Sequence, residues 1–153
     1  MSNYENLRLN NQLCFALYAA THAIVRAYRP RLGKVGLTYP QYLVLLVMWE
    51  TDGMTVKGLA HRLKLDSGTL TPLLKRLESA GLMTRRRSLE DERIVNIFLT
   101  PEGRVLEHKV AQMQHEVACQ TELSPTEFVE LRDTLYRLIE TMTESQQAAT
   151  AIA

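Results

Sequence analysis

The stretch LAHRLKLDSGTLTPLLKRLESAGLMTRRRSLEDERIVNIFL, residues 59–99, decides the fold because it predicts two short helices followed by two strands. Thr55 can cap the first helix, and the chain breaks at Leu65-Asp66. Asp66 or Ser67 then caps a second helix that Gly81 stops and in which Pro72 should distort the early turns. Two short helices joined by three or four residues, the second rich in Ser, Thr and basic side chains, are typical of a helix-turn-helix.

A β-hairpin is predicted directly after these helices. Residues 82–88 and 93–99 have strand character and are joined by the charged turn LEDE. Between residues 57 and 87 there are eight Lys or Arg and two acidic residues, although the whole chain has a net charge of only +1. A helix-turn-helix with a wing and a local basic surface indicates binding to duplex DNA.

Long helices are expected on both sides of this unit. The first covers residues 6–31 and is ended by Pro30 and Gly33, and a second, apolar helix starts at Thr38 with Gln41 completing a capping box. After the hairpin, one helix runs from Pro101 to about Thr121 and another begins at a second capping box, residues 124–127. The predicted fold class is therefore mainly α, with a small β-hairpin as the wing.

The terminal helices carry apolar stripes that no second domain covers, which indicates oligomerisation. A two-fold homodimer is the commonest solution and suits double-stranded operator DNA with pseudo-palindromic half-sites. Within one chain of residues 1–153, we expect dimerisation helices at 6–36 and 101–145. Residues 37–100 form the DNA-binding unit.

The residues expected to contact DNA lie on the second short helix and in the wing. Short hydroxyl side chains in the first helical turns can meet bases or phosphates, although Ser67 could equally well only cap the helix. In the wing, an acidic residue two positions before an arginine can orient the guanidinium for the minor groove; a solvated surface ion pair is the alternative. The predicted contacts are Ser67, Thr69, Thr71, Lys75, Arg76, Arg85, Arg86, Arg87, Asp91 and Arg93.

Several classes of function are disfavoured by what the sequence lacks. The longest apolar run, residues 42–49, is too short to cross a membrane, and no secretory signal is visible, so we expect a cytoplasmic protein. No cysteine and histidine cluster has the spacing of a metal site, and we expect no cofactor. A thiol peroxidase is disfavoured because the chain has neither a thioredoxin-like pattern nor a CxxC motif; the chain is not expected to be an enzyme.

Two cysteines, Cys14 and Cys119, are expected to be free thiols or a transient redox pair in a reducing compartment. Cys14 falls in the middle of the expected first helix, where the helix dipole should help a thiolate little. Tyr18 lies one turn away on the same face. Tyr28 lies on nearly the same face of the helix, but about 21 Å from Cys14 along the helix axis. If Tyr28 meets a Cys14 thiol, that thiol must belong to the partner in a dimer.

The chain resembles the MarR family of dimeric winged-helix repressors over nearly its whole length. The resemblance is carried by GLTYPQYLVLLVMWE, residues 36–50, by residues 59–103, and especially by the wing motif DERIVNIFLTPEG. CFALY at Cys14, together with Tyr28 and Tyr39, looks like the organic hydroperoxide resistance branch of that family. This likeness implies a sensing thiol at Cys14 in a pocket of Tyr18, Tyr28 and Tyr39. It also implies a resolving thiol, Cys119, on the partner subunit.

Two mechanisms of regulation follow. In the first, an organic hydroperoxide oxidises Cys14, an intersubunit disulfide forms with Cys119, and the repressor releases its operator. In the alternative, a small phenolic or other ligand binds without covalent chemistry and Cys14 is an inert core residue. Replacing Cys14 with Ser distinguishes the two mechanisms, because the substitution would abolish induction in the first and leave it intact in the second.

Overall fold

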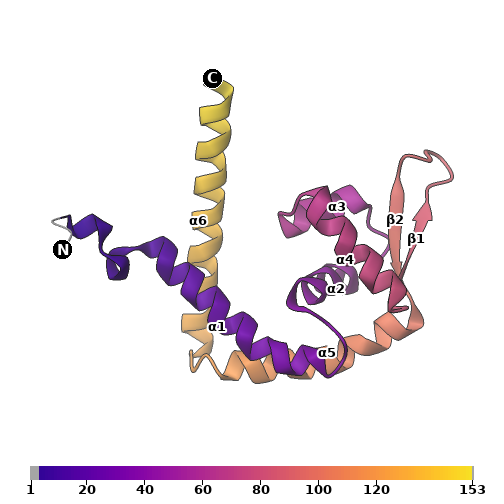
Figure 1. Cartoon of the computed structure of the whole chain (residues 1–153), viewed down its shortest axis with the longest axis horizontal. Helices are drawn as coiled ribbons and strands as arrows, with labels where there is room; N and C mark the ends of the chain where they lie inside the picture. Colours follow the sequence, from indigo (N-terminus) through magenta and orange to yellow (C-terminus); the bar gives the residue numbers. More distant parts are fainter. Residues whose placement is uncertain (1–3, 153) are drawn as a thin grey trace. The chain divides into compact units, whose positions relative to one another are not determined.

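The computed structural model describes residues 4–152, and the side chains of residues 4–147. The elements in chain order are two 3₁₀ turns, η1 (Glu5–Leu7) and η2 (Leu9–Asn11), then α1 (Leu13–Gly33), α2 (Tyr39–Glu50), α3 (Val56–Leu63), α4 (Ser67–Ser79), β1 (Met83–Arg87), β2 (Val95–Leu99), α5 (Pro101–Cys119) and α6 (Pro125–Ile152). The mainly helical fold with one two-stranded sheet confirms the predicted class (Figure 1). Among the described residues, no helix is long and apolar enough to cross a membrane.

The helix-turn-helix forms as its caps predict. Thr55 Oγ1 accepts the Gly58 N–H at 3.0 Å to start α3, and Lys64 ends this helix in the left-handed region at φ 53°. Asp66, not Ser67, caps α4, since its carboxylate accepts the Thr69 N–H at 2.8 Å. The helix continues through Pro72 to Ser79.

The wing is an antiparallel hairpin with Met83 opposite Leu99 and Arg87 opposite Val95. Figure 1 shows it beside α4, with the turn between the strands extending away from the helices. Its inner end is anchored, because Met83 and Ile97 are fully buried in the core. The outer end therefore projects on a rigid base.

The core is built around α2. Its side chains Val44, Leu45 and Met48 are inaccessible to solvent, and they pack in one cluster with Leu70, Leu74 and Leu77 from α4 and with residues of α1, α3, the hairpin and α5. The predicted central role of this apolar helix is confirmed. The Gln41 side chain at its start accepts the Thr38 N–H at 2.8 Å, as the capping-box pattern indicates.

The first helix differs from its prediction at both ends. It begins at Leu13 rather than residue 6, because the side-chain amides of Asn11 and Gln12 bond to the backbone carbonyls of residues 5, 6 and 8 and hold that segment in 3₁₀ turns. It also continues past Pro30 to Gly33. Full burial of Leu32 keeps the last turn helical, since the turn must stay wound to place this side chain in the core.

The last two helices lie mainly in different units of the chain, because one unit contains residues 1–117 and the other contains residues 118–153. Thr100 caps α5 in the first unit by accepting the Gly103 N–H at 3.1 Å, and this helix ends at Cys119, close to the expected end at about Thr121. In the second unit, Ser124 and Glu127 form the predicted capping box, with Ser124 N–H to Glu127 Oε2 at 2.9 Å. Among the described side chains of α6, none is buried.

Candidate functional site

The exposed face of α4 carries the polar residues that the sequence singled out. Leu70, Leu74 and Leu77 form its buried stripe, and Lys75 and Arg76 point to the opposite side, where they are exposed. Ser67 is exposed at the first helical position. Its hydroxyl makes no hydrogen bond to the described residues, so the capping interpretation of Ser67 is not what the structure shows.

The two threonines have their hydroxyl protons already engaged. Thr69 Oγ1 donates to Asp66 Oδ2 at 2.7 Å, and Thr71 Oγ1 donates to the Ser67 carbonyl at 2.7 Å. Both oxygens can still accept hydrogen bonds. These bonds from Thr69 lower the pKa of the Asp66 carboxyl, which is thus ionised at neutral pH. The start of α4 therefore has a fixed geometry before any ligand arrives.

The three arginines of β1 have different environments. Arg85 is bound by Glu78 of α4, with Arg85 Nε to Glu78 Oε2 at 2.8 Å, and this pairing occupies its guanidinium. The guanidinium of Arg86 lies over the Phe98 ring, 5.1 Å from its centre. Arg87, at the outer end of the strand, is exposed and makes no ion pair with the described residues. Of the three, Arg87 is the one placed to meet a phosphate without breaking a contact.

At the tip of the wing, Asp91 holds Arg93 in two ways. Its Oδ1 accepts the Arg93 N–H at 3.0 Å and lies 3.7 Å from the guanidinium nitrogen Nε. The Arg93 side chain is 94% exposed, so its guanidinium is accessible. The ion pair is present, as both the orienting interpretation and the surface ion-pair alternative require, and the orienting role stays a prediction.

A cleft of about 630 Å³ joins the helix-turn-helix to the wing. It brings Ser67 of α4 and Arg93 of the wing turn into one site, and it adds an exposed lysine that was not among the predicted contacts, Lys57. Lys57 lies in the first turn of α3 and within the basic segment, which is the signal that could have identified it. The cleft is lined by Thr55, Val56, Lys57, Ser67, Arg93, Ile94 and Val95.

Three tyrosines cluster where α1 meets α2, and they are not the three that the sequence grouped. The ring of Tyr28 lies 5.4 Å from that of Tyr39 and 5.1 Å from that of Tyr42, which was not predicted. The Tyr42 hydroxyl donates to the Tyr28 hydroxyl at 3.5 Å, and burial together with this contact raises the pKa of Tyr42. Tyr18 lies outside the cluster and packs on His22, with ring centres 4.3 Å apart.

Cys14 is the second residue of α1, so its placement in the middle of a helix was wrong. The amide N–H groups of a first helical turn have no partners within the helix and can donate to a thiolate. The Cys14 side chain is exposed, as is that of Cys119 at the end of α5. Since α1 separates Cys14 from Tyr28 by fourteen residues, or about 21 Å of helix, the tyrosine cluster does not surround the thiol of its own chain.

No metal site is evident in the part of the chain that the structure describes, where His, Cys, Asp and Glu form no group of three that could hold an ion.

Residues 26–110 match the family model described as transcriptional regulator SarA/Rot. The chain belongs to this family of transcriptional regulators. It is also 45% identical to the organic hydroperoxide resistance transcriptional regulator of Bacillus subtilis, over 92% of this chain and 96% of that protein. The resemblance to MarR-type winged-helix regulators and to their organic hydroperoxide resistance branch is confirmed.

Two solved structures of the regulator AbfR from Staphylococcus epidermidis have the same fold. The reduced AbfR bound to DNA superimposes with a TM-score of 0.72 at 39% identity, over 89% of this chain and 99% of that one. The disulfide-formed AbfR gives 0.64 at 35% identity, over 94% of this chain and 95% of that one. This SarA/Rot family member is therefore a DNA-binding transcriptional regulator, and the prediction of that class is confirmed.

Proposed function

We propose that this regulator is a dimeric repressor that releases its operator when an organic hydroperoxide oxidises Cys14. The observation that carries the proposal is the position of Cys14, an exposed thiol in the first turn of α1. The name of the B. subtilis relative supports the inducer, and the reduced and disulfide-formed structures of AbfR support a thiol switch in a homologous fold.

On DNA, α4 would enter the major groove with Ser67, Thr69 and Thr71 in its first turns, while Lys75 and Arg76 reach phosphates. Arg93, oriented by Asp91, would enter the minor groove. The cleft that joins Ser67, Arg93 and Lys57 carries two cationic side chains, and we expect it to face a phosphate backbone between the helices and the wing. Arg87 and Arg86 add phosphate attraction, and Arg85 acts mainly through Glu78.

The dimer is supported by apolar side chains that a single chain leaves uncovered on its terminal helices. On α1 these include Leu13, Phe15 and Ile24, and on α6 they include Phe128, Leu131 and Met142. Helices with such stripes require a partner to bury them. We assign dimerisation to residues 6–36 and 101–145, and a two-fold axis then matches a pseudo-palindromic operator.

The dimer would also supply Cys14 with phenol hydrogen-bond donors, which its own chain does not place around the thiol. With the first helices antiparallel across the axis, Cys14 of one subunit could approach the Tyr28 and Tyr39 phenols of the other, and their O–H groups would donate to the sulfur. Tyr42 would support this pocket from behind, because its hydroxyl bonds to Tyr28. Tyr18 would line only the path by which the peroxide reaches this pocket, since it lies outside the tyrosine cluster.

The chemistry has two steps. The Cys14 thiolate attacks the terminal peroxide oxygen, the O–O bond breaks, and the alkoxide takes a proton to leave as an alcohol, which gives a sulfenic acid. The Cys119 thiol then attacks the sulfenic sulfur, an S–S bond forms and water leaves. The disulfide would join the partner subunits and reorient the two DNA-binding units.

A non-reducing denaturing gel of the reduced protein, run before and after about one equivalent of an organic hydroperoxide, tests this directly. We expect a reducible band at twice the monomer mass, and no such band from Cys14→Ser or Cys119→Ser. In parallel, operator binding should be lost after oxidation in the unmodified protein and retained in Cys14→Ser.

The absence of both the dimer band and sulfenic acid at Cys14 by mass spectrometry would overturn the sensing mechanism. If an oxidised band forms but Cys119→Ser still gives it, the resolving role of Cys119 is wrong while Cys14 remains the sensor. The sensing role of Cys14 and the resolving role of Cys119 are thus tested separately.

A further inference from the structure

The turn between α2 and α3 runs beside β2 at the base of the wing. The Gly53 N–H donates to the Ile97 carbonyl at 2.9 Å, and the Ile97 N–H donates to the Met54 carbonyl at 2.9 Å. Asp52 continues this ladder with its side chain, because its Oδ1 accepts the Leu99 N–H at 2.8 Å. The turn is therefore fastened to β2 by both main-chain and side-chain hydrogen bonds.

The second oxygen of the same carboxylate holds α5. Asp52 Oδ2 accepts a hydrogen bond from Nη2 of Arg104, the fourth residue of α5, and the two side chains form an ion pair. The Asp52 side chain is only 24% exposed, so salt screens this pair less than a fully exposed one. Asp52 thus has one oxygen on the wing and the other on α5.

The main chain connects β2 to α5 through a single residue, Thr100, because β2 ends at Leu99 and α5 begins at Pro101. Figure 1 shows α5 starting at the base of the wing. A one-residue connection can turn about its backbone dihedral angles, so it does not by itself fix the angle between strand and helix. Asp52 adds a second connection, from Leu99 to Arg104, and this connection restricts the angle between the wing and α5.

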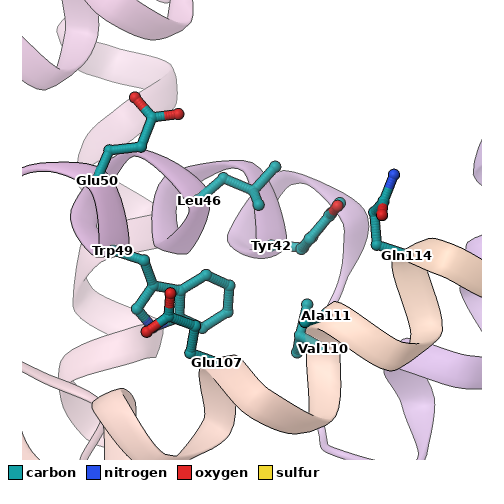
Figure 2. Close-up of a pocket in the computed structure, with 8 residues that line it drawn as sticks. All are labelled: Tyr42, Leu46, Trp49, Glu50, Glu107, Val110, Ala111 and Gln114. Atoms are coloured by element: carbon teal, nitrogen blue, oxygen red, sulfur yellow. The ribbon is translucent and has the colours of Figure 1, made fainter.

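Another hydrogen bond holds the first turn of α5 to α2. Trp49 Nε1 donates to the Gly103 carbonyl at 2.9 Å. Figure 2 shows the Trp49 side chain extending from α2 toward α5, whereas Glu50 points away from α5. The Trp49 contact joins α5 to α2, and the Asp52 contact joins α5 to the wing as well.

The other end of α5 carries the proposed resolving thiol, because Cys119 is the last residue of the helix. Fifteen residues separate Cys119 from Arg104, which is about 22 Å of helix. A helix of this length is a rigid element that carries a movement of one end to the other. A disulfide at Cys119 would therefore also displace Arg104.

We propose that Asp52 is the positioning residue that transmits the state of the thiol switch to the wing. This inference rests on the proposed function, because the signal is the disulfide between Cys14 and Cys119. In the reduced protein, Asp52 holds the wing at the angle that places Arg93 for operator DNA. When α5 tilts on disulfide formation, Arg104 draws Asp52 and β2 with it, and the wing leaves that angle.

The test compares DNA release with disulfide formation in the full-length protein. Asp52→Asn keeps an oxygen for the Leu99 N–H but removes the charge that pairs with Arg104. Glu50→Gln is the matched control, because it removes the carboxylate of an ion pair with Arg62 of α3 and leaves the contacts between α5 and the wing in place. The probe is a fluorescent operator duplex selected with the reduced parent protein. Anisotropy titrations give the Kd of each protein when reduced and when a non-reducing gel shows complete disulfide formation.

Reduced Asp52→Asn should bind the operator no more than about threefold more weakly than the parent, since buried Met83 and Ile97 still anchor the wing. The ratio of oxidised to reduced Kd should be smaller than in the parent by about fivefold or more, at equal disulfide content. Glu50→Gln should keep the ratio of the parent. Arg104→Gln should lower the ratio as Asp52→Asn does, and combining the two should add nothing further, because they remove the same ion pair.

Equal ratios in the parent, Asp52→Asn and Arg104→Gln would overturn this proposal and leave the thiol switch intact. An equally lowered ratio in Glu50→Gln would also overturn it, because loss of a nearby carboxylate would then suffice. If the parent forms no disulfide with an organic hydroperoxide or with diamide, both this proposal and the resolving role of Cys119 are wrong.

Discussion

Glu78 on α4 binds Arg85 on β1 through three contacts: Arg85 Nε and Nη2 donate to Glu78 Oε2 at 2.8 and 2.6 Å, and the Arg85 N–H donates to Oε1 at 3.2 Å. The pair ties α4 to the wing at the point where the hairpin leaves the core. These hydrogen bonds from Arg85 lower the pKa of the Glu78 carboxyl below its ordinary value of 4.5.

The first prediction concerns this pair and pH. Since the folded-state pKa is lowered, the pair stabilises the fold above pH 4.5, and the stabilisation is lost as pH falls through the lowered value. Glu78→Gln should reduce the free energy of unfolding by about 0.2–1 kcal/mol at neutral pH, with a smaller difference at about pH 4. Urea unfolding at both pH values measures it. Glu90→Gln, in the wing turn, is the control for loss of one exposed carboxylate.

The second prediction concerns the wing tip. Arg93→Ala should weaken operator binding about tenfold or more, because the oriented guanidinium is lost. Asp91→Ala should give a smaller loss, since Arg93 remains but is no longer held. Fluorescence anisotropy at fixed salt measures both. Lys34→Ala, an exposed cation outside the basic segment, should have no effect; an equal loss in this control would contradict the assignment.

The third prediction compares two arginines of β1. Arg87 is expected to contact a phosphate, whereas Arg85 is paired with Glu78 of α4. Arg87→Ala should weaken binding to operator and non-specific DNA alike and reduce the salt slope by about 1. Arg85→Ala should change the salt slope less, because its charge is already paired with Glu78. Binding titrations at several salt concentrations distinguish the two, and identical slopes would show that Arg85 also meets the backbone of DNA.

The fourth prediction compares two helical glycines. A Cβ on Gly103 would lie 2.1 Å from the Leu82 carbonyl oxygen, so Gly103→Ala should destabilise the fold by about 1–3 kcal/mol despite the better helix propensity of alanine. Gly33 has open space at that position, and Gly33→Ala should be neutral or stabilising by up to about 1 kcal/mol. Thermal or urea unfolding measures both changes, and a neutral Gly103→Ala would show that α5 can shift away from Leu82.

The fifth prediction rests on the proposed thiol chemistry. Tyr39→Phe removes a phenol that could donate to sulfur but keeps the ring that packs on Tyr28. Oxidation of Cys14 by an organic hydroperoxide should therefore slow, while the unfolding midpoint stays within a small margin of the parent. Stopped-flow oxidation kinetics measure the rate. Tyr136→Phe, on α6, is the matched control, and equal rates in the two variants would contradict a role for the Tyr39 hydroxyl.

The local elements of this protein follow from its sequence, because their signals lie within a few residues of one another. Thr55 and Asp66 each accept an N–H three residues later, Ser124 and Glu127 bond reciprocally, and the alternating strands flank a short charged turn. The exposed position of Arg93 beside Asp91 also follows from a spacing of two residues.

Tertiary packing decided the features that depend on distant residues. Leu32 holds α1 helical beyond Pro30 because its side chain is needed in the core, and Gly103 must lack a Cβ because Leu82 comes close. Packing of α2 on α1 placed Tyr42, rather than Tyr18, with Tyr28 and Tyr39. Pairing across α4 and β1 occupied Arg85. Caps and turns depend on residues a few positions apart and can be seen in the sequence. Burial and pairing join side chains of different elements, from seven residues apart for Glu78 and Arg85 upward, and only the folded chain brings those together.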